Sequence, residues 1–541
     1  MISKGGVENI FDQGSSTRAS VLKGGKQVVL GGGVSTDATV SGTQTVSTGG
    51  TTVSAQVRVG GLQDVHGDAD NSVVFKGGKQ VVSSGGAGNF TVVSSGGTQS
   101  VLAGGLSDSA TISSGAIQYV YGRTTATLVT SFADEIVYAG VDSGGDISGG
   151  VAWISGGSVV SAEVQAGSGQ TLYPGATATG MIIGDLGAQE LGNGQGLPGG
   201  TDSGTVVSNG GVEDVFDGGV ASNTQVHSGG TMLVASGGLS VSAVMASGAG
   251  QTLHGVTGEL DAVASGAVLK GGDQYVESGG FAYDTIISAG AVLDVYSGGV
   301  IGADGPTFSG GGTLRIENAS DYTSGNESTP VGGFTGSAQI DLANVSFSAG
   351  PTLQWTQQNS RLGYLVVTDG TNTAVVSLLG QYMAGNFALK TDGFGGTLVV
   401  DPRSTPGARP RSPSVCRGQG RRRDGKRPRP RQLALDAWSR AHGHEDGAVG
   451  QAHGRIAGDD PPQDRFHGAV GVARTGTAHE VHAGHTAVDV EPARTQQTLC
   501  LALGPIGVAL RLRGSRVGGG GGDQQCGRAQ RESPSVHGLH P

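Results

Sequence analysis

Residues 1–402 contain no cysteine, because Cys416, Cys500 and Cys526 all lie beyond this point of the 541-residue chain. They also contain no run of about 18 apolar residues, the length that a membrane-spanning helix needs. Met1 leads directly into a polar repeat without the apolar core of a secretory signal. Glycine is abundant, at 104 residues, but forms no Gly-x-y triplets. Disulfide frameworks, helical membrane spans and collagen are therefore excluded for this part, and either the N-terminus is incomplete or export uses another signal.

The charge of the chain changes sign near residue 402. Residues 1–402 hold 12 Lys and Arg against 32 Asp and Glu, a net charge of −20, whereas residues 403–541 hold 21 against 12, a net of +9. Nine of the 12 histidines also lie in the second part. An acidic balance argues against nucleic-acid binding by residues 1–402. The two parts are different kinds of sequence.

A short repeat occupies residues 1–318. Gln80, Gln99 and Gln118 are 19 residues apart, and each is followed two positions later by valine. Residues 123–200 keep the composition but blur the period. Self-similarity at a short fixed period is typical of a solenoid. The glutamine position can be followed elsewhere as Glu8, Gln27, Gln44, Gln63, Glu213, Met232, Gln251, Gln274 and Leu293.

Each repeat predicts two short strands joined by Gly-Gly or Ser-Gly corners. Strands of about five residues cannot bury a face alone, whereas units stacked about 4.8 Å apart pair every backbone group with the turns above and below. Met232 and Leu293 replace glutamine, so we expect this position to point inward, where amides can hydrogen-bond along the axis. We predict an all-β fold, a parallel β-solenoid (β-helix) of roughly 17 strand-loop-strand units.

Residues 319–402 are more apolar and predict a β-rich capping module. An open solenoid end is an unpaired sheet edge, which a bulkier segment can cover. The aromatic residues that gather in this segment are Phe347, Trp355, Tyr364, Tyr382, Phe387 and Phe394.

Residues 403–541 form a low-complexity tail rich in Arg, Gly and His, which is either disordered or translated out of frame. The run Arg421–Arg431 has the charge to bind nucleic acid or an anionic surface, but GC-rich DNA read in the wrong frame yields the same composition. The histidines of His479–His485 lack the spacing of a zinc-protease helix. The cysteines form no Cys-x-x-Cys pair, and Arg516–Asp523 lacks the Lys-Ser/Thr of a phosphate loop. No metal or cofactor is expected.

Three acidic pairs within the repeats could be read as the carboxylates of a glycan-cleaving β-helix. They are Asp134-Glu135, Glu213-Asp214 and Glu259/Asp261. They lie far apart along the chain without a groove of aromatic residues, so we interpret them as solvated surface charge. The tandem Gly-Gly-x-Gly-x-Asp motif of calcium-binding repeats is absent. We therefore predict no catalytic, cofactor-binding or metal-binding residue.

The Gly-Gly-x-Gln-x-Val repeat of residues 1–318 resembles the strand-loop-strand repeat of bacterial autotransporter passengers, the stalks of AIDA-type adhesins. Residues 319–402, with Gly380-Gln-Tyr-Met and Asp392-Gly-Phe-Gly, resemble the segment that ends such arrays in many alphaproteobacterial exported proteins. The resemblance implies a following outer-membrane barrel or Hint domain and heptose on Ser/Thr hydroxyls. Neither domain can be recognised in residues 403–541: a barrel would need more aromatic residues than this part contains, and the residues after Cys416 do not resemble the start of a Hint domain.

The sequence thus predicts a non-catalytic, adhesin-like stalk at the bacterial surface or outside the cell. Its expected partners are a host or bacterial surface, or other rods of the same kind, and its Ser/Thr turns are candidates for glycosylation. One alternative is a glycan-active β-helix enzyme, which needs long loops that gather acids and aromatic residues on one face. Another is a secreted scaffold for a lost Hint or barrel domain, which sequencing of the gene around residues 395–420 would test.

Overall fold

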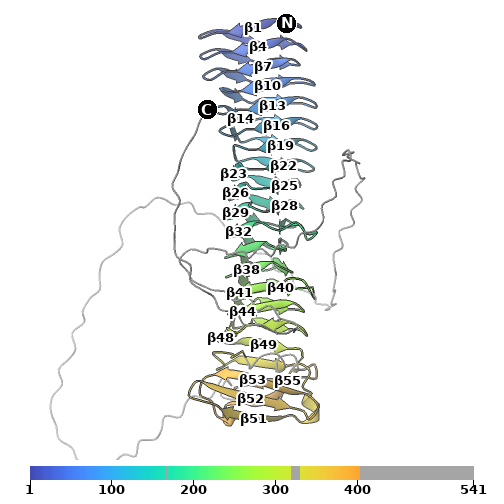
Figure 1. Ribbon diagram of the computed structural model, residues 1–541, viewed down its shortest axis with the longest axis vertical. Coiled ribbons are helices and arrows are strands. Elements are labelled where there is room, and N and C mark those ends of the chain that lie inside the picture. The colour runs from blue at the N-terminus through green and yellow to red at the C-terminus, as the bar shows by residue number, and fades with distance from the viewer. Residues whose placement is uncertain (166, 257, 319–328, 402–541) are drawn as a thin grey trace, which may run out of the picture. The chain divides into compact units, whose positions relative to one another are not determined.

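The computed structural model describes residues 1–401 except 166, 257 and 319–328. Successive repeats form coils that stack one above another, from β1 at one end to β51–β53 at the other (Figure 1). Each coil gives one strand to each of three parallel sheets, and the pairing stays in register from coil to coil. The predicted parallel β-solenoid is confirmed.

The sheet that carries the glutamine position, here called the ladder sheet, has 20 strands. Its strands are β1 (Val7–Ile10), β4 (Lys26–Val29), β7 (Thr43–Val46), β10 (Leu62–Val65), β13 (Lys79–Val82), β16 (Thr98–Val101), β19 (Ile117–Val120), β22 (Asp134–Val137), β25 (Val151–Ile154), β28 (Gly169–Leu172), β31 (Ala188–Leu191), β34 (Val212–Val215), β37 (Thr231–Ala235), β40 (Gly250–His254), β43 (Asp273–Val276), β46 (Val292–Val295), β49 (Gly312–Ile316), β50 (Ala338–Leu342), β54 (Ala388–Thr391) and β55 (Thr397–Val400).

The second sheet follows the ladder sheet in each coil and has 16 strands. These are β2 (Ser15–Thr17), β5 (Val34–Thr36), β8 (Thr51–Val53), β11 (Asp68–Asp70), β14 (Ala87–Asn89), β17 (Leu106–Asp108), β20 (Arg123–Thr125), β23 (Val141–Ser143), β26 (Ser158–Val160), β29 (Thr177–Thr179), β32 (Thr201–Ser203), β35 (Val220–Ser222), β38 (Leu239–Val241), β41 (Ala262–Ser265), β44 (Gly280–Tyr283) and β47 (Val300–Ile301).

The third sheet completes each coil and also has 16 strands. These are β3 (Ser20–Val21), β6 (Thr39–Val40), β9 (Gln56–Val57), β12 (Val73–Val74), β15 (Val92–Val93), β18 (Thr111–Ile112), β21 (Leu128–Thr130), β24 (Asp146–Ser148), β27 (Glu163–Gln165), β30 (Ile182–Ile183), β33 (Val206–Val207), β36 (Gln225–Val226), β39 (Val244–Ala246), β42 (Val268–Lys270), β45 (Ile286–Ser288) and β48 (Thr307–Ser309).

The expectation of two strands per repeat was wrong, because every coil has a third corner between the second and third sheets. This corner turns on one residue in the left-handed conformation, such as Asn71 (φ 54°), Phe90 (φ 53°) or Ser109 (φ 54°). Residues other than glycine can adopt this backbone conformation at a modest energetic cost when only one residue is involved. The third corner therefore carries no Gly-Gly signal.

The Gly-Gly corners use their two glycines differently. Gly60 has a φ of +73° with open space where a side chain would begin, so its role is conformational. Gly61 lies against the preceding coil, where an added Cβ would collide with the carbonyl oxygen of Val40. The first glycine makes the bend, and the second lets neighbouring coils approach closely.

The glutamine position points inward and forms a ladder of hydrogen bonds, as predicted. Gln99 Nε2 donates to Gln80 Oε1 at 2.6 Å, and Gln118 Nε2 donates to Gln99 Oε1 at 2.6 Å. The register continues without a break through residues 123–200, where Glu135 and Ala152 take this position in the next two coils. Aliphatic side chains of the third sheet, such as Val93 and Ile112, fill the rest of the interior.

Beyond residue 329 the described chain closes the stack. β50 pairs in parallel with β49, and β55 then pairs antiparallel with β50, so the coiling ends here. A separate antiparallel sheet consists of β51 (Thr352–Gln357), β52 (Leu362–Thr368) and β53 (Thr373–Leu379). Two 3-10 helices, η1 (Phe347–Ala349) and η2 (Ala384–Asn386), lie in the segments that connect this sheet to β50 and to β54.

Aromatic side chains form the interior of this closing segment. Phe334 is buried and packs against Phe387, with ring centroids 5.9 Å apart. Trp355 and Tyr382 make an edge contact at 5.5 Å, and the Tyr382 hydroxyl donates to the Phe334 carbonyl at 3.0 Å. Phe394, in contrast, is 80% exposed. In the part of the chain that the structure describes, no helix is long and apolar enough to cross a membrane.

Candidate functional site

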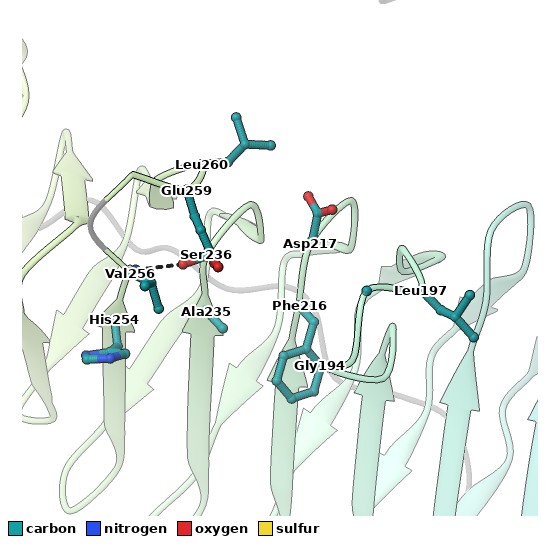
Figure 2. A pocket seen from close by; sticks show the side chains of 11 residues that line it. Gly194, Leu197, Phe216, Asp217, Ala235, Ser236, His254, Val256, Glu259 and Leu260 are labelled. Carbon is teal, nitrogen blue, oxygen red and sulfur yellow. Dashed lines mark hydrogen bonds between the residues drawn. The ribbon is translucent and has the colours of Figure 1, made fainter. Parts of the chain in front are cut away.

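Two corners on one side of the solenoid carry extra residues. Residues 192–200 connect β31 to β32, and residues 255–261 connect β40 to β41. Both follow the ladder sheet, where the coils between them turn with fewer residues; residues 216–219, for example, connect β34 to β35. The two insertions therefore rise from the same edge of the stack and bound a trough, which Figure 2 shows.

The trough has a volume of about 470 Å³. Phe216, in the corner after β34, and Ala235, the last residue of β37, come from the two intervening coils. The Phe216 ring points into the space between the insertions (Figure 2). Leu197 stands on one side, and Val256 and Leu260 stand on the other. The remaining lining residues are Gly194, Gly196, Asp217, Ser236, His254 and Glu259.

Hydrogen bonds fix the walls of the trough. The backbone N–H of Val256 donates to Ser236 Oγ at 2.7 Å (Figure 2), which ties the second insertion to the corner of the preceding coil. In the first insertion Asn193 Oδ1 accepts the backbone N–H of Leu197 at 3.1 Å. At the edge of the trough His254 Nδ1 lies 2.7 Å from Glu277 Oε2.

The chemistry of the trough is that of an open, acidic and partly apolar surface. Leu197 and Val256 are each 51% exposed, so apolar area faces solvent next to the Phe216 ring. Asp217 and Glu259 are exposed and offer carboxylate oxygens, which accept hydrogen bonds from hydroxyl or amino groups. Such a site can hold a ligand that has one apolar face and several donors. Among the described residues, no three His, Cys, Asp or Glu side chains converge to hold a metal ion.

The acidic pairs singled out in the sequence lie in three different environments. Glu259 and Asp261 are exposed in the second insertion, as the interpretation of surface charge requires. Asp134 and Asp214 lie half-buried on the outer face of the ladder sheet. Burial, together with the charge of Glu190, raises the pKa of Asp214 to about 6.

For Glu135 and Glu213 the interpretation as solvated charge was wrong. Both occupy the inward ladder position, and both side chains are buried. Strand alternation explains the error, because the inner partner of each Asp-Glu pair must face the opposite side of the sheet from the outer one. Other acids are also buried, among them Asp142 and Asp202, and were not recognised in the sequence.

The sequence contained one signal for the trough, the lengthened repeat step. Gln251 and Gln274 are 23 residues apart while pairing directly in the ladder. Gln189 pairs with Glu213 across 24 residues, but this step was hidden in the stretch with a blurred period. Step lengths locate the insertions, although they do not show that both leave the same corner. The motifs beyond residue 402, including the cysteines and His479–His485, lie outside the described residues.

Comparison with solved structures gives several matches. The chain is similar to a TibC-catalysed, hyper-glycosylated fragment of TibA, at 32% sequence identity and a TM-score of 0.44. The match covers 47% of this chain and 93% of that fragment. No protein-family model matches the chain, and no curated protein matches it either.

Proposed function

We propose that the protein is a non-catalytic stalk, at the bacterial surface or secreted, that serves in adhesion or self-association. The observation that carries this proposal is the unbroken parallel pairing of coils in three sheets. Such a stack has long, repetitive side faces, the kind of extended surface that solenoid proteins use for binding. The segment around β51–β53 acts as the cap of its C-terminal end, as proposed for residues 319–402, and prevents end-to-end pairing.

The side faces set the conditions for association of like rods. Residues 1–402 carry a net charge of −20, so parallel rods repel one another at low ionic strength. Salt screens this repulsion but leaves the hydrogen bonds that backbone groups and Ser/Thr hydroxyls of neighbouring rods can form with one another. The state of association of the purified full chain should therefore rise with ionic strength, as measured by light scattering. A response that is flat across salt concentrations, at several protein concentrations, contradicts self-association.

Exposed hydroxyls along the corners are the proposed sites of glycosylation. Ser95 and Ser114 are both exposed and occupy the same corner of successive coils. Regular spacing of hydroxyls along one ridge would give a transferase a repeated target. Mass spectrometry of the protein from its native host should find hexose- or heptose-sized increments on such peptides. Unmodified peptides throughout the repeats would exclude this proposal without affecting the stalk.

The trough supports a second candidate, a glycan-binding or glycan-active site on the stalk. The specific observation is that two insertions gather Phe216, Asp217 and Glu259 around one depression. An aromatic ring can stack on the apolar face of a sugar, and carboxylates can accept hydrogen bonds from its hydroxyl groups. Phe216→Ala should abolish retention on a column of the recognised glycan, while Phe11→Ala, an exposed phenylalanine in the first coil, should not. Equal retention by both variants, or no retention by the wild type on any glycan, rejects this candidate.

A further inference from the structure

The glutamine ladder has a direction. In each run the side-chain Nε2 of one glutamine donates to the Oε1 of the glutamine in the preceding coil. The first run begins where Gln27 Nε2 donates to Glu8 Oε2 at 2.7 Å. A carboxylate accepts hydrogen bonds only, so reversing the amides would turn Gln27 Oε1 against Glu8. The run continues through the pairs Gln44–Gln27, Gln63–Gln44, Gln80–Gln63, Gln99–Gln80 and Gln118–Gln99.

This direction leaves the last glutamine of every run with an Oε1 that receives no amide N–H from the next coil. For Gln274 a donor in its own coil takes this place, the Thr285 hydroxyl 2.9 Å away. Gln118 Oε1 and Gln189 Oε1 are buried and have no hydrogen-bond partner. The residues that pair with these two glutamines in the next coil are Glu135 and Glu213.

A glutamate can donate a hydrogen bond inside the ladder only if its carboxyl group carries a proton. An ionised carboxylate would repel the glutamine Oε1, whereas a carboxylic acid has one O–H to donate. Glu135 is 1% exposed and Glu213 is fully buried, and the buried residues of the described chain include no Lys, Arg or His. A buried charge without a counter-ion is costly, so the neutral acid is favoured.

Each glutamate also faces an aspartate inside the solenoid. Burial raises the pKa of Glu135 well above its usual value, and the charge of Asp142 raises it further. Burial raises the pKa of Asp142 to about 6, although the Thr124 hydroxyl, which donates to Asp142 Oδ1 at 2.8 Å, favours the charged form. The aspartate therefore loses its proton first, and the glutamate retains one.

The second pair follows the same rule. Burial raises the pKa of Glu213 most, and the charge of Asp202 and a hydrogen bond between the two carboxyl groups raise it further. The charge of Asp214 on the outer face adds a weaker increase, whereas the nearby Thr224 hydroxyl lowers the pKa. Burial also raises the pKa of Asp202, against the opposing effects of the nearby Thr205 hydroxyl and Gln189 amide. These acids are the charged groups that influence Glu213, and each of them adds negative charge when it ionises.

We propose that Glu135 and Glu213 are carboxylic acids in the folded protein, that the Glu135 O–H donates to Gln118 Oε1 and the Glu213 O–H donates to the Asp202 carboxylate, and that alkaline pH opens the solenoid interior at these two points. Groups whose pKa is higher in the folded than in the unfolded chain stabilise the fold fully below the unfolded value, about 4.3 for glutamate. That stabilisation is lost as the pH rises through the folded value. The solenoid thus has two internal weak points that acid closes and base opens.

Infrared spectroscopy of the full chain tests the protonation directly. At neutral pH the wild type should show the C=O stretch of protonated side-chain carboxyls, and Glu135→Gln and Glu213→Gln should each remove part of this band. Glu163→Gln, a glutamate on the outer face of β27, is the matched control and should leave the band unchanged. A wild-type spectrum without the band, or a band that persists unchanged in the double variant, overturns the proposal.

Hydrogen exchange tests the opening. As the pH is raised from about 6 to about 9, and after correction for intrinsic exchange, β19, β22, β31 and β34 should lose protection before coils with an uninterrupted amide ladder. The double variant supplies amide donors at both points and should lose this selective opening and part of the alkaline decrease in melting temperature. Gln99→Glu should create a third weak point at β16. Uniform exchange along the stack, or an identical pH profile for the double variant, contradicts the proposed device.

Discussion

Gln44 Nε2 donates to Gln27 Oε1 at 2.7 Å inside the solenoid, although the two residues are 17 positions apart. The next bond of the ladder, from Gln63 to Gln44, spans 19 positions at 2.9 Å. Residues are therefore gained and lost in the corners while the interior repeats without change. The ladder fixes the register of the coils because a slip by one residue would turn every amide outward.

Replacing a glutamine in the middle of the ladder should destabilise the fold. Gln80 donates to Gln63 Oε1 at 2.7 Å and accepts from Gln99 Nε2 at 2.6 Å. Gln80→Met leaves Gln63 Oε1 without its donor and gives Gln99 Nε2 only a weakly accepting thioether in place of an amide oxygen. The loss of a buried hydrogen bond costs about 1–3 kcal/mol. We expect the free energy of unfolding in urea to fall by roughly 2–4 kcal/mol.

The matched control is a glutamine at the start of a run. Gln170 Nε2 has no hydrogen-bond partner, since Ala152 takes the ladder position in the preceding coil. Gln170→Met resembles the natural start of the last run, where Met232 Sδ accepts from Gln251 Nε2 at 3.2 Å. It should cost less than half as much as Gln80→Met. Equal losses for the two variants would mean that side-chain volume, and not the ladder, sets the cost.

The two glycines of one corner should respond differently to alanine. Gly60→Ala meets no neighbouring atom and costs only the left-handed conformation, about 1–2 kcal/mol. Gly61→Ala collides with the backbone carbonyl of Val40 and must separate two coils, so it should cost about 3 kcal/mol or more. Thermal unfolding of both variants under the same conditions gives the comparison. A larger loss at Gly60 would show that the approach of the coils is not limiting.

The sequence predicted those features of the fold that repeat. Gln80, Gln99 and Gln118 reveal the period, and the replacement by Met232 shows that the position faces inward. From these facts the parallel stacking follows, because it alone pairs the backbone of such short strands. The third corner did not follow, since residues as different as Asn71 and Phe90 fill its single left-handed position.

The repeat pattern could not predict the features that occur only once in the chain. The sequence supported two conflicting predictions for Glu213: its place in the repeat put it on the inward ladder, whereas its pairing with Asp214 suggested solvated surface charge. The structure resolves the conflict, because Glu213 pairs with Gln189 in the ladder and is buried. The trough depends on two insertions three coils apart that leave the same corner. Phe216 becomes a candidate binding residue only through this placement, because its own position in the repeat is an ordinary turn.

The third corner allows a paired test of the left-handed position. Ala126 (φ 51°) and Gly144 (φ 68°) occupy this corner in successive coils, and an added Cβ at Gly144 would meet no atom within 4 Å. Ala126→Gly should therefore raise the free energy of unfolding by about 0.5–1 kcal/mol, and Gly144→Ala should lower it by about 1 kcal/mol. Chemical denaturation of both variants measures the two effects. Changes of the same sign would show that contacts, and not backbone conformation, dominate this corner.

The hairpin between β52 and β53 should open in strong acid through Asp369. Its carboxylate accepts the backbone N–H groups of Ser346 and Thr371, both at 2.8 Å, and of Asn372 at 2.7 Å. These bonds lower the pKa of Asp369 to about 2. A group whose pKa is lowered by folding stabilises the fold above its unfolded value, about 3.9 for aspartate, and this contribution is lost as the pH falls through about 2.

Hydrogen exchange of residues 369–373 should therefore accelerate between about pH 4 and about pH 2 in the wild type, relative to the intrinsic rate. Asp369→Ala should exchange rapidly at every pH, because no acceptor holds the three N–H groups. Asp369→Asn keeps one carbonyl oxygen without a titrating charge, so it should show intermediate protection and no acid transition. If the asparagine variant kept the full acid transition, another group would control this turn, and the three backbone hydrogen bonds to Asp369 would contribute nothing to its acid sensitivity.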